Sequence, residues 1–174
     1  KKEKIHMEDM CQLTERLTEN KYHGSYEQIA KAILKYSVTP GLDVVNFMEQ
    51  VLFSFLTGNA DMHLKNFSLI NQPNRGNILS PAYDMVATAI VNPADDEDLA
   101  LTLNAKKKKI KRSDFEAAFN TLNLDPRQQQ NIFQKMEKTK VQWFECIEKS
   151  FISDDFKVQY KELITERFLR LHNS

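Results

Sequence analysis

The 174-residue chain is 41% hydrophobic and 28% charged, which is the size and composition of one soluble globular domain. This composition excludes a disulfide-stabilised mini-protein, a disordered tail and a collagen-like or low-complexity chain. The 24 lysines and arginines balance the 24 aspartates and glutamates, so we expect no dominant electrostatic attraction to nucleic acid or to an anionic membrane.

The cysteines and the apolar stretches indicate a reducing compartment and no membrane. Cys11 and Cys146 lie far apart and outside any CxxC pattern, which favours free thiols over a disulfide. The longest apolar stretch, residues 51–56, is too short to span a bilayer. No apolar core follows the charged residues 1–4, so no cleavable signal is expected and the predicted localisation is cytoplasmic.

Helical patterns dominate the first third of the chain. Residues 7–18 combine good helix formers with an apolar stripe and predict a first helix. Ser25 opens a capping box, which predicts a second helix that runs to about Ser37. Residues 42–57 are apolar on nearly every face and predict a central buried helix, and Gly58 stands where a C-terminal glycine cap belongs.

The middle third changes to strand and loop patterns. Residues 67–70 and 78–79 are short β candidates, and the turn formers between them predict a hairpin. Another apolar run follows at residues 85–91. The acidic residues 95–98 and the basic residues 106–112 are expected to form surface loops.

The last third returns to helix. Ser113 is expected to cap a short helix, and Asp125, which is followed by proline, predicts the start of a long amphipathic helix that runs to about Ser150. A final helix is expected from Ser153. The fold class predicted is therefore mainly α, as one domain over residues 1–174 with a small β-hairpin near its middle.

Residues 58–68, directly after the predicted buried helix, are the most unusual segment. Burying polar groups without partners costs roughly 1–3 kcal/mol each, so their crowding at the end of a core helix suggests a functional site. The alternative is a polar loop that only caps the helix. The polar residues concerned are Asn59, Asp61, His63, Lys65 and Asn66.

Asp84 lies just beyond the predicted hairpin. A hairpin brings its two ends together, so we expect Asp84 to return near Asp61 and Asn66. Two carboxylates and an amide oxygen form a hard oxygen site of the kind that Mg²⁺ prefers. Phosphoryl transfer needs such a metal site beside an aspartate that accepts or orients the substrate hydroxyl. In this interpretation Asp61 handles the hydroxyl, and Lys65 can meet the transferring phosphoryl group.

Two signatures, in the right order and spacing, closely resemble the catalytic core of the HipA-family serine/threonine kinases, the toxins of bacterial toxin–antitoxin pairs. They are residues 59–68, Asn-Ala-Asp-Met-His-Leu-Lys-Asn-Phe-Ser, and residues 79–85, Leu-Ser-Pro-Ala-Tyr-Asp-Met. Residues 6–12 and 100–104 also resemble that family. The resemblance covers most of the chain, and the Asp-x-His-x-x-Asn core is also similar to that of the phosphatidylinositol kinases.

The resemblance implies a helical C-terminal kinase lobe and a role for each candidate residue. Asp61 would be the proton acceptor or hydroxyl-positioning residue, with Lys65 as a second catalytic residue. Asn66 and Asp84 would hold Mg²⁺ beside the nucleotide. The other residues expected to contact ATP are His63 and Lys65, along the phosphates, and Tyr83, which would border the nucleotide.

The family also implies partners. Its substrate is a protein serine or threonine, in the studied members on an aminoacyl-tRNA synthetase. Its partner is a small HipB-like DNA-binding antitoxin, so DNA would be reached only indirectly, through that antitoxin. The basic residues 106–112 are then either a phosphate, DNA or antitoxin contact or a solvated loop offset by residues 95–98.

A complete kinase also needs an N-terminal lobe with a loop that covers the phosphates. The glycines here are isolated from one another, so no glycine-rich loop is expected, and no β-rich segment with a lysine precedes the catalytic motif. We therefore expect the C-terminal lobe alone, with the N-terminal nucleotide-binding lobe absent from this chain. Without that lobe the isolated chain is expected to be inactive.

Two other functions stay open at this point. A metal-dependent hydrolase or nuclease would use Asp61, His63 and Asp84 as ligands around an activated water, and would leave Asn66 without a role. A non-enzymatic scaffold would instead use the same lobe only to hold an antitoxin.

Overall fold

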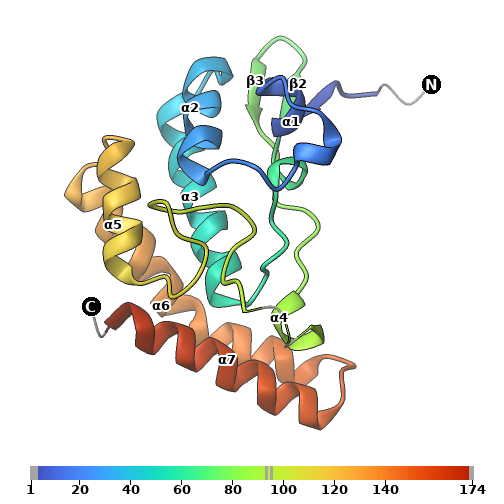
Figure 1. Ribbon diagram of the computed structural model, residues 1–174, viewed down its shortest axis with the longest axis vertical. Helices are drawn as coiled ribbons and strands as arrows, with labels where there is room; N and C mark the ends of the chain where they lie inside the picture. The colour runs from blue at the N-terminus through green and yellow to red at the C-terminus, as the bar shows by residue number, and fades with distance from the viewer. Residues whose placement is uncertain (1–3, 93, 95, 173–174) are drawn as a thin grey trace.

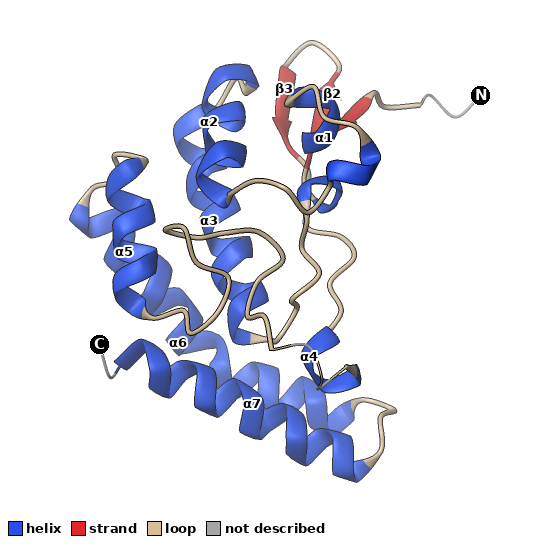
Figure 2. Cartoon of the chain, viewed as in Figure 1, coloured by secondary structure: helices blue, strands red, loops and turns tan. Residues whose placement is uncertain are grey.

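Helices make up most of the structure, and a small antiparallel sheet lies at one end of it (Figure 1, Figure 2). The computed structural model describes residues 4–92, 94 and 96–172. Asp95, the first residue of the predicted acidic loop, lies outside the described residues. Within the described ranges, no helix is both long enough and apolar enough to cross a membrane. The mainly α fold class with a small β element is confirmed.

The sheet of the described chain has three strands in the order β1-β2-β3. Strands β2 (Ser68–Gln72) and β3 (Gly76–Leu79) form the predicted hairpin, in which Ile70 faces Ile78. Strand β1 (Met7–Asp9) pairs antiparallel with the other edge of β2. The helix predicted over residues 7–18 is therefore wrong, because the first of these residues are extended against a partner strand sixty positions away.

Only a short part of that predicted helix is helical. Asp9 ends β1 and caps α1 (Met10–Leu13), since its Oδ1 accepts the Gln12 N–H at 3.0 Å. A 3₁₀ turn, η1 (Thr18–Asn20), follows after a stretch without regular structure. Part of the apolar stripe seen in the sequence thus lies in β1 and part in the single turn of α1.

Helices α2 (Tyr26–Tyr36) and α3 (Pro40–Leu56) follow the sequence pattern closely. The Ser25 hydroxyl accepts the Gln28 N–H at 3.2 Å, which confirms the capping box. Helix α3 begins two residues before the predicted start because proline is favoured in the first turn. Gly58 follows α3 with a φ of 70°, a backbone conformation that glycine adopts without the strain of a side chain.

The C-terminal half contains α4 (Thr88–Val91), α5 (Arg112–Thr121), α6 (Pro126–Lys149) and α7 (Asp154–His172). Asp125 caps α6 through the Gln128 N–H at 2.8 Å, as predicted. Ser113 does not cap α5: the helix begins at Arg112, and the Asp114 carboxylate accepts the Lys111 N–H at 3.0 Å. The N-cap is therefore Lys111, two positions before the serine, and the acidic side chain in the first turn binds its N–H.

The core forms around α3, which contacts α2, β3, α6 and α7. In Figure 1, α6 and α7 cross below one end of α3, while the hairpin lies beside the other. Phe47 of α3 packs edge-on against Phe67, with ring centroids 4.9 Å apart, and Tyr26 packs edge-on against Phe67 at 6.1 Å. These aromatic contacts bind the start of the hairpin to the helical core.

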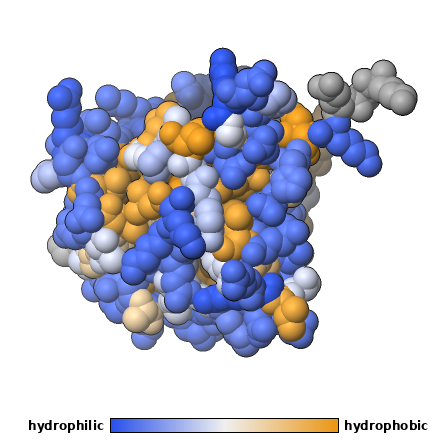
Figure 3. All heavy atoms as spheres, turned by 90° about the horizontal axis from the view of Figure 1, so that it is seen from above, coloured by the Kyte–Doolittle hydropathy of each residue, from blue (hydrophilic) through white to orange (hydrophobic). Residues whose placement is uncertain are grey.

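The molecular surface mixes apolar and polar groups. Figure 3 shows apolar patches separated by hydrophilic side chains on the face seen from above. Exposed apolar side chains occur singly on most folded proteins, so those that line cavities are the informative ones.

The segment between α4 and α5 is only partly the surface loop that was expected. Lys107 pairs with Glu97 at 3.3 Å and Lys108 pairs with Asp96, so the basic and acidic runs offset each other. Asp98, however, is buried, with an exposed fraction of 4%. The prediction of a solvated loop is wrong at this residue, because α7 supplies two cations for it.

Asp98 is the anchor of this segment. Its carboxylate pairs with Arg167 and Arg170 of α7 and accepts the Ile110 N–H at 2.9 Å. Burial alone raises the pKa of Asp98, but the hydrogen bond from Arg170 and the charge of Arg167 more than offset it and hold that pKa below its ordinary value.

We expect the Asp98→Asn variant to lose about 3 kcal/mol of unfolding free energy at pH 7, because it leaves two arginines without their counter-charge. Since the folded carboxyl has the lower pKa, its stabilising effect is complete above the unfolded value and is lost as pH falls below about 4. Urea unfolding of both proteins across this pH range measures the difference.

The exposed Asp96→Asn variant is the matched control, because exposed ion pairs contribute only about 0–1 kcal/mol. Equal losses for the two variants would show that Asp98 is not a buried anchor.

Candidate active site

The polar stretch after α3 folds into a tight loop that ends in a 3₁₀ turn, η2 (Leu64–Asn66), just before β2. Its side chains are enclosed: Asn59, His63 and Asn66 have exposed fractions of 2%, 6% and 4%. The buried Tyr26 hydroxyl donates to the Met62 carbonyl at 3.0 Å and fixes the middle of the loop. The loop is therefore part of the core and not a mobile cap.

Asn66 and Asp84 meet, as the hairpin predicted. The Asn66 Nδ2 donates to the Asp84 Oδ2 at 2.5 Å, although 18 positions separate the two residues. Asp84 has a φ of 56°, in the left-handed region, where a residue other than glycine is strained by about 1–2 kcal/mol. Strained residues of this kind cluster at functional sites, where the surroundings hold them in place.

Asn59 connects Asp61 to the same point. Its Oδ1 accepts the Asp61 N–H at 3.3 Å, and its Nδ2 donates to the Asp84 carbonyl at 3.4 Å. One buried amide thus holds the backbones of both carboxylate residues.

Tyr22 is a residue of the site that the sequence did not reveal. Its hydroxyl donates to the Asp61 Oδ1 at 2.7 Å, and its ring lies edge-on to His63 with centroids 4.9 Å apart. Burial, the hydrogen bond to Asp61 and the charge of that carboxylate raise the pKa of Tyr22 to about 12, so the hydroxyl keeps its proton at neutral pH. Tyr22 lies in a segment without local signals, and only the fold brings it to Asp61.

His63 is buried, and its surroundings disfavour its charged form. Burial lowers the pKa of His63, and the Lys21 ammonium lowers it further, against the opposing effect of Asp61 and Asp84. Its Nδ1 has no hydrogen-bond partner among the residues that the structure describes. A buried polar atom without a partner needs an explanation, and a bound polar ligand is one.

Lys65 and Tyr83 lie on the side of the loop that faces β1 and β2. The Lys65 Nζ pairs with the Asp9 Oδ2 at 2.9 Å, which raises the pKa of Lys65. The Tyr83 hydroxyl donates to the Lys65 carbonyl at 2.8 Å and contacts the Ser68 hydroxyl at 2.6 Å. Lys65 is thus held by Asp9 of β1, and Tyr83 is held by the polar loop and the first residue of β2.

The residues present fit a divalent cation at Asn66 and Asp84. A carboxylate and an amide supply hard oxygen ligands of the kind that Mg²⁺ prefers. Within the described part of the chain, no group of three or more His, Cys, Asp or Glu side chains could hold a metal ion. The alternative site made of Asp61, His63 and Asp84 as joint ligands is therefore not formed.

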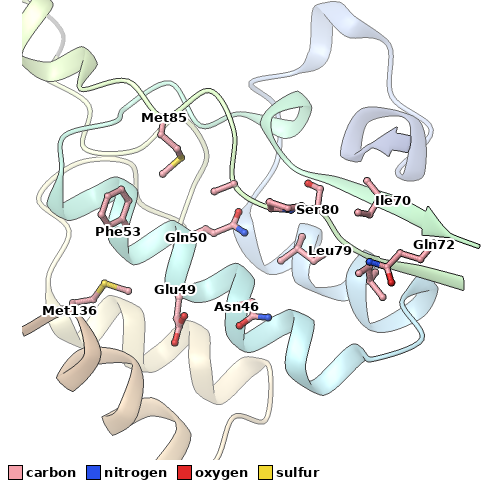
Figure 4. Close-up of a pocket in the computed structure, with 13 residues that line it drawn as sticks. Asn46, Glu49, Gln50, Phe53, Ile70, Gln72, Leu79, Ser80, Met85 and Met136 are labelled. Atoms are coloured by element: carbon pink, nitrogen blue, oxygen red, sulfur yellow. The ribbon is translucent and has the colours of Figure 1, made fainter. Parts of the chain in front are cut away.

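A cavity of about 540 Å³ is lined by residues of α3, the hairpin and α6 (Figure 4). Phe53 of α3, Ile70 of β2, Met85 and Met136 of α6 give it a largely apolar lining. None of the predicted site residues lines it, although Met85 is the neighbour of Asp84. We do not assign the nucleotide to this cavity.

The family model of the HipA-like C-terminal domain matches residues 1–144. The chain is 37% identical over 107 residues to "Putative kinase Y4dM" of Sinorhizobium fredii, which covers 61% of this chain and 25% of that protein. It is 37% identical over 71 residues to a "Putative kinase" of Haemophilus influenzae, covering 41% and 21%. The matched segments thus span a quarter or less of these relatives.

Solved structures share the fold. A chain from the Shewanella oneidensis complex of HipA, HipB and operator DNA superposes with a TM-score of 0.84 at 20% identity, over 97% of this chain and 44% of that one. The Helicobacter pylori proinflammatory kinase CtkA gives a TM-score of 0.58 at 15% identity, over 97% and 69%. At such identities the likeness shows the fold alone, and it confirms the fold predicted from the resemblance.

The strain at Asp84 can be tested directly. Because φ is positive there, we expect Asp84→Gly to be more stable than Asp84→Ala by about 1 kcal/mol in urea unfolding. At Lys138, an exposed position inside α6, the order reverses, with alanine more stable by about 1 kcal/mol. An alanine variant at residue 84 as stable as the glycine variant would contradict the backbone described here.

Proposed function

Because the chain belongs to the HipA-like C-terminal domain family, we propose that it forms the catalytic lobe of a protein serine/threonine kinase. The kinase uses ATP and Mg²⁺ and transfers the γ-phosphate to a protein hydroxyl. The observation that carries the proposal is the 2.5 Å contact of Asn66 with Asp84, beside a loop that also holds Asp61. Phosphoryl transfer depends on such a pair of ligands next to a carboxylate that orients the nucleophile. The curated relatives named as kinases support the reaction class.

We assign Asp61 to the acceptor hydroxyl. Its carboxylate already accepts a hydrogen bond from a hydroxyl, that of Tyr22. Asn59 holds its N–H, and Thr88 holds the neighbouring Ala60 N–H at 2.9 Å, so the carboxylate stands on a fixed backbone. A carboxylate within hydrogen-bond reach of the acceptor can orient it and take its proton as the new O–P bond forms.

Asn66 and Asp84 would hold Mg²⁺, which when bound neutralises charge on the phosphates. We assign His63 and Lys65 to the phosphates, since the buried Nδ1 of His63 lacks a partner among the described residues and Lys65 carries a positive charge beside the loop. Tyr83 borders the nucleotide, with its hydroxyl fixed by two hydrogen bonds.

The activity belongs to a longer assembly than this lobe. The chain spans 44% of the HipA-complex chain that it matches, and its curated matches cover a quarter or less of those relatives. The proposal therefore includes an N-terminal nucleotide-binding lobe outside residues 1–174, a HipB-like antitoxin as partner, and DNA reached only through that antitoxin. The substrate is a protein, in the cytoplasm, of the class of the aminoacyl-tRNA synthetases.

The role of Asp61 predicts a large loss of phosphotransfer in the complete protein. Asp61→Ala should lower the rate by about 10²- to 10⁴-fold, the usual contribution of a positioned general base. Incorporation of labelled phosphate from ATP into protein measures the rate, and a circular dichroism melt shows that the fold survives. Asp154→Ala, at an exposed aspartate of α7, is the matched control and should keep full activity. Normal transfer by the Asp61 variant would refute the assignment.

The metal ligands predict a separate loss. In the complete protein with ATP, Asp84→Asn and Asn66→Leu should each weaken Mn²⁺ binding by at least about tenfold, because each removes one oxygen ligand or its charge. Electron paramagnetic resonance of free Mn²⁺ measures this without relying on catalysis. Asp154→Asn should bind Mn²⁺ as the unchanged protein does, and equal binding by all three variants would exclude this site.

A further inference from the structure

A second cavity, of about 360 Å³, opens directly beside Asp61. Tyr22 and Asp61 line one end of it, and the segment around α4 lines another wall. Its volume is at the lower end of the roughly 300–1,000 Å³ range of ligand sites, which suits a few side chains better than a large cofactor.

At one end of this cavity the Asp61 carboxylate already binds a hydroxyl group. The Tyr22 hydroxyl points at the Asp61 carboxylate and donates to it at 2.7 Å. The carboxylate has a second oxygen, and a carboxylate accepts several hydrogen bonds at once. A hydroxyl that enters the cavity can therefore reach Asp61 from the same side.

The wall made by α4 carries exposed apolar side chains beside the polar Thr88 and Asn92. Val86 and Val91 line the cavity and have exposed fractions of 51% and 74%. Ala89 lies between them, and its N–H donates to the Gly58 carbonyl at 2.9 Å. The Thr88 hydroxyl binds the Ala60 N–H, so this wall keeps a fixed position relative to Asp61.

The charge of the lining favours an occupant that carries no charge of its own near Asp61. The ionised side chains that line it, Asp61 and Glu97, are both acidic, and Glu97 is paired with Lys107 at 3.3 Å. Acidic side chains repel phosphates. The occupant is therefore uncharged near Asp61 and presents a hydroxyl and an apolar group.

On these grounds we propose that the cavity receives the acceptor segment of the protein substrate, with a serine or threonine hydroxyl on Asp61 and a neighbouring aliphatic side chain against Val86 and Val91. This inference rests on the proposed function, because it takes Asp61 as the residue that meets the acceptor. It adds a sequence preference: aliphatic residues beside the phosphorylated hydroxyl are accepted and acidic ones are rejected.

Peptide binding to the ¹⁵N-labelled 174-residue chain tests the inference without relying on catalysis. The probes are two end-blocked peptides, Gly-Val-Ser-Val-Gly and Gly-Asp-Ser-Asp-Gly. We expect the valine peptide to shift the amide signals of Ala60, Ala89 and Ala100, which line the cavity, and the aspartate peptide to leave them unchanged. Equal binding of both peptides, no binding, or shifts confined to another surface would overturn the inference.

Variants of the wall sharpen this test. Val91→Asp should raise the dissociation constant of the valine peptide by about tenfold or more, the effect of losing one buried valine side chain. Val91→Thr, which nearly keeps the shape of the side chain, should raise it less. Val141→Asp, at an exposed valine of α6, is the matched control and should leave the constant unchanged. An unchanged constant for Val91→Asp would overturn the inference.

The kinase assignment and the acceptor cavity can be refuted independently. If the Asp61→Ala protein transfers phosphate normally, the kinase assignment falls whatever the peptides do. If that variant is inactive but the valine peptide leaves Ala60 and Ala89 unperturbed, the kinase assignment stands and the acceptor cavity is refuted.

Discussion

The burial of α3 is the constraint on which the rest of the structure depends. Phe47 and Phe55 of this helix are fully enclosed, and each packs against an aromatic ring from another element. Asp43 of the same helix is also buried, and its carboxylate accepts the Leu79 N–H at 2.9 Å. The helix therefore fixes both where the polar loop starts, at its C-terminal end, and where the hairpin ends. The positions of Asp61 and Asp84 therefore both depend on α3.

The polar loop is stable because its side chains satisfy one another and the backbone around them. Asn59 and Asn66 each donate through the side-chain NH₂ group and accept through the side-chain oxygen within the site. Unpaired amides of this kind would cost several kcal/mol in the core. His63 Nδ1 is the exception within the described residues, and Asp84 carries backbone strain. Most polar groups of the loop thus have partners within the protein. The unpaired nitrogen and the strained backbone belong to His63 and Asp84, two of the residues proposed to bind ligand.

The sequence predicted the features that depend on interactions between residues close together in the chain. The caps at Ser25 and Asp125, the glycine after α3 and the hairpin all follow from neighbouring residues, and all are present. The convergence of Asp84 with Asn66 followed from the hairpin.

The features that the sequence did not reveal need distant partners. Strand β1 is extended because β2 offers an edge, Asp98 is buried because α7 supplies arginines, and Tyr22 reaches Asp61 across the fold. No periodicity or motif near Asp98 or Tyr22 carries that information. The roles of Asp61, Lys65 and the metal ligands were inferred from residue types and spacing and from the family resemblance, and they stay proposals.

Asp9 joins three parts of the molecule through one side chain and one peptide. It ends β1, caps α1 and pairs with the ammonium of Lys65. A shift of β1 along β2 would therefore displace Asp9, which caps α1 and is the ion-pair partner of Lys65. The position of the Lys65 ammonium beside the polar loop thus depends on the pairing of β1 with β2.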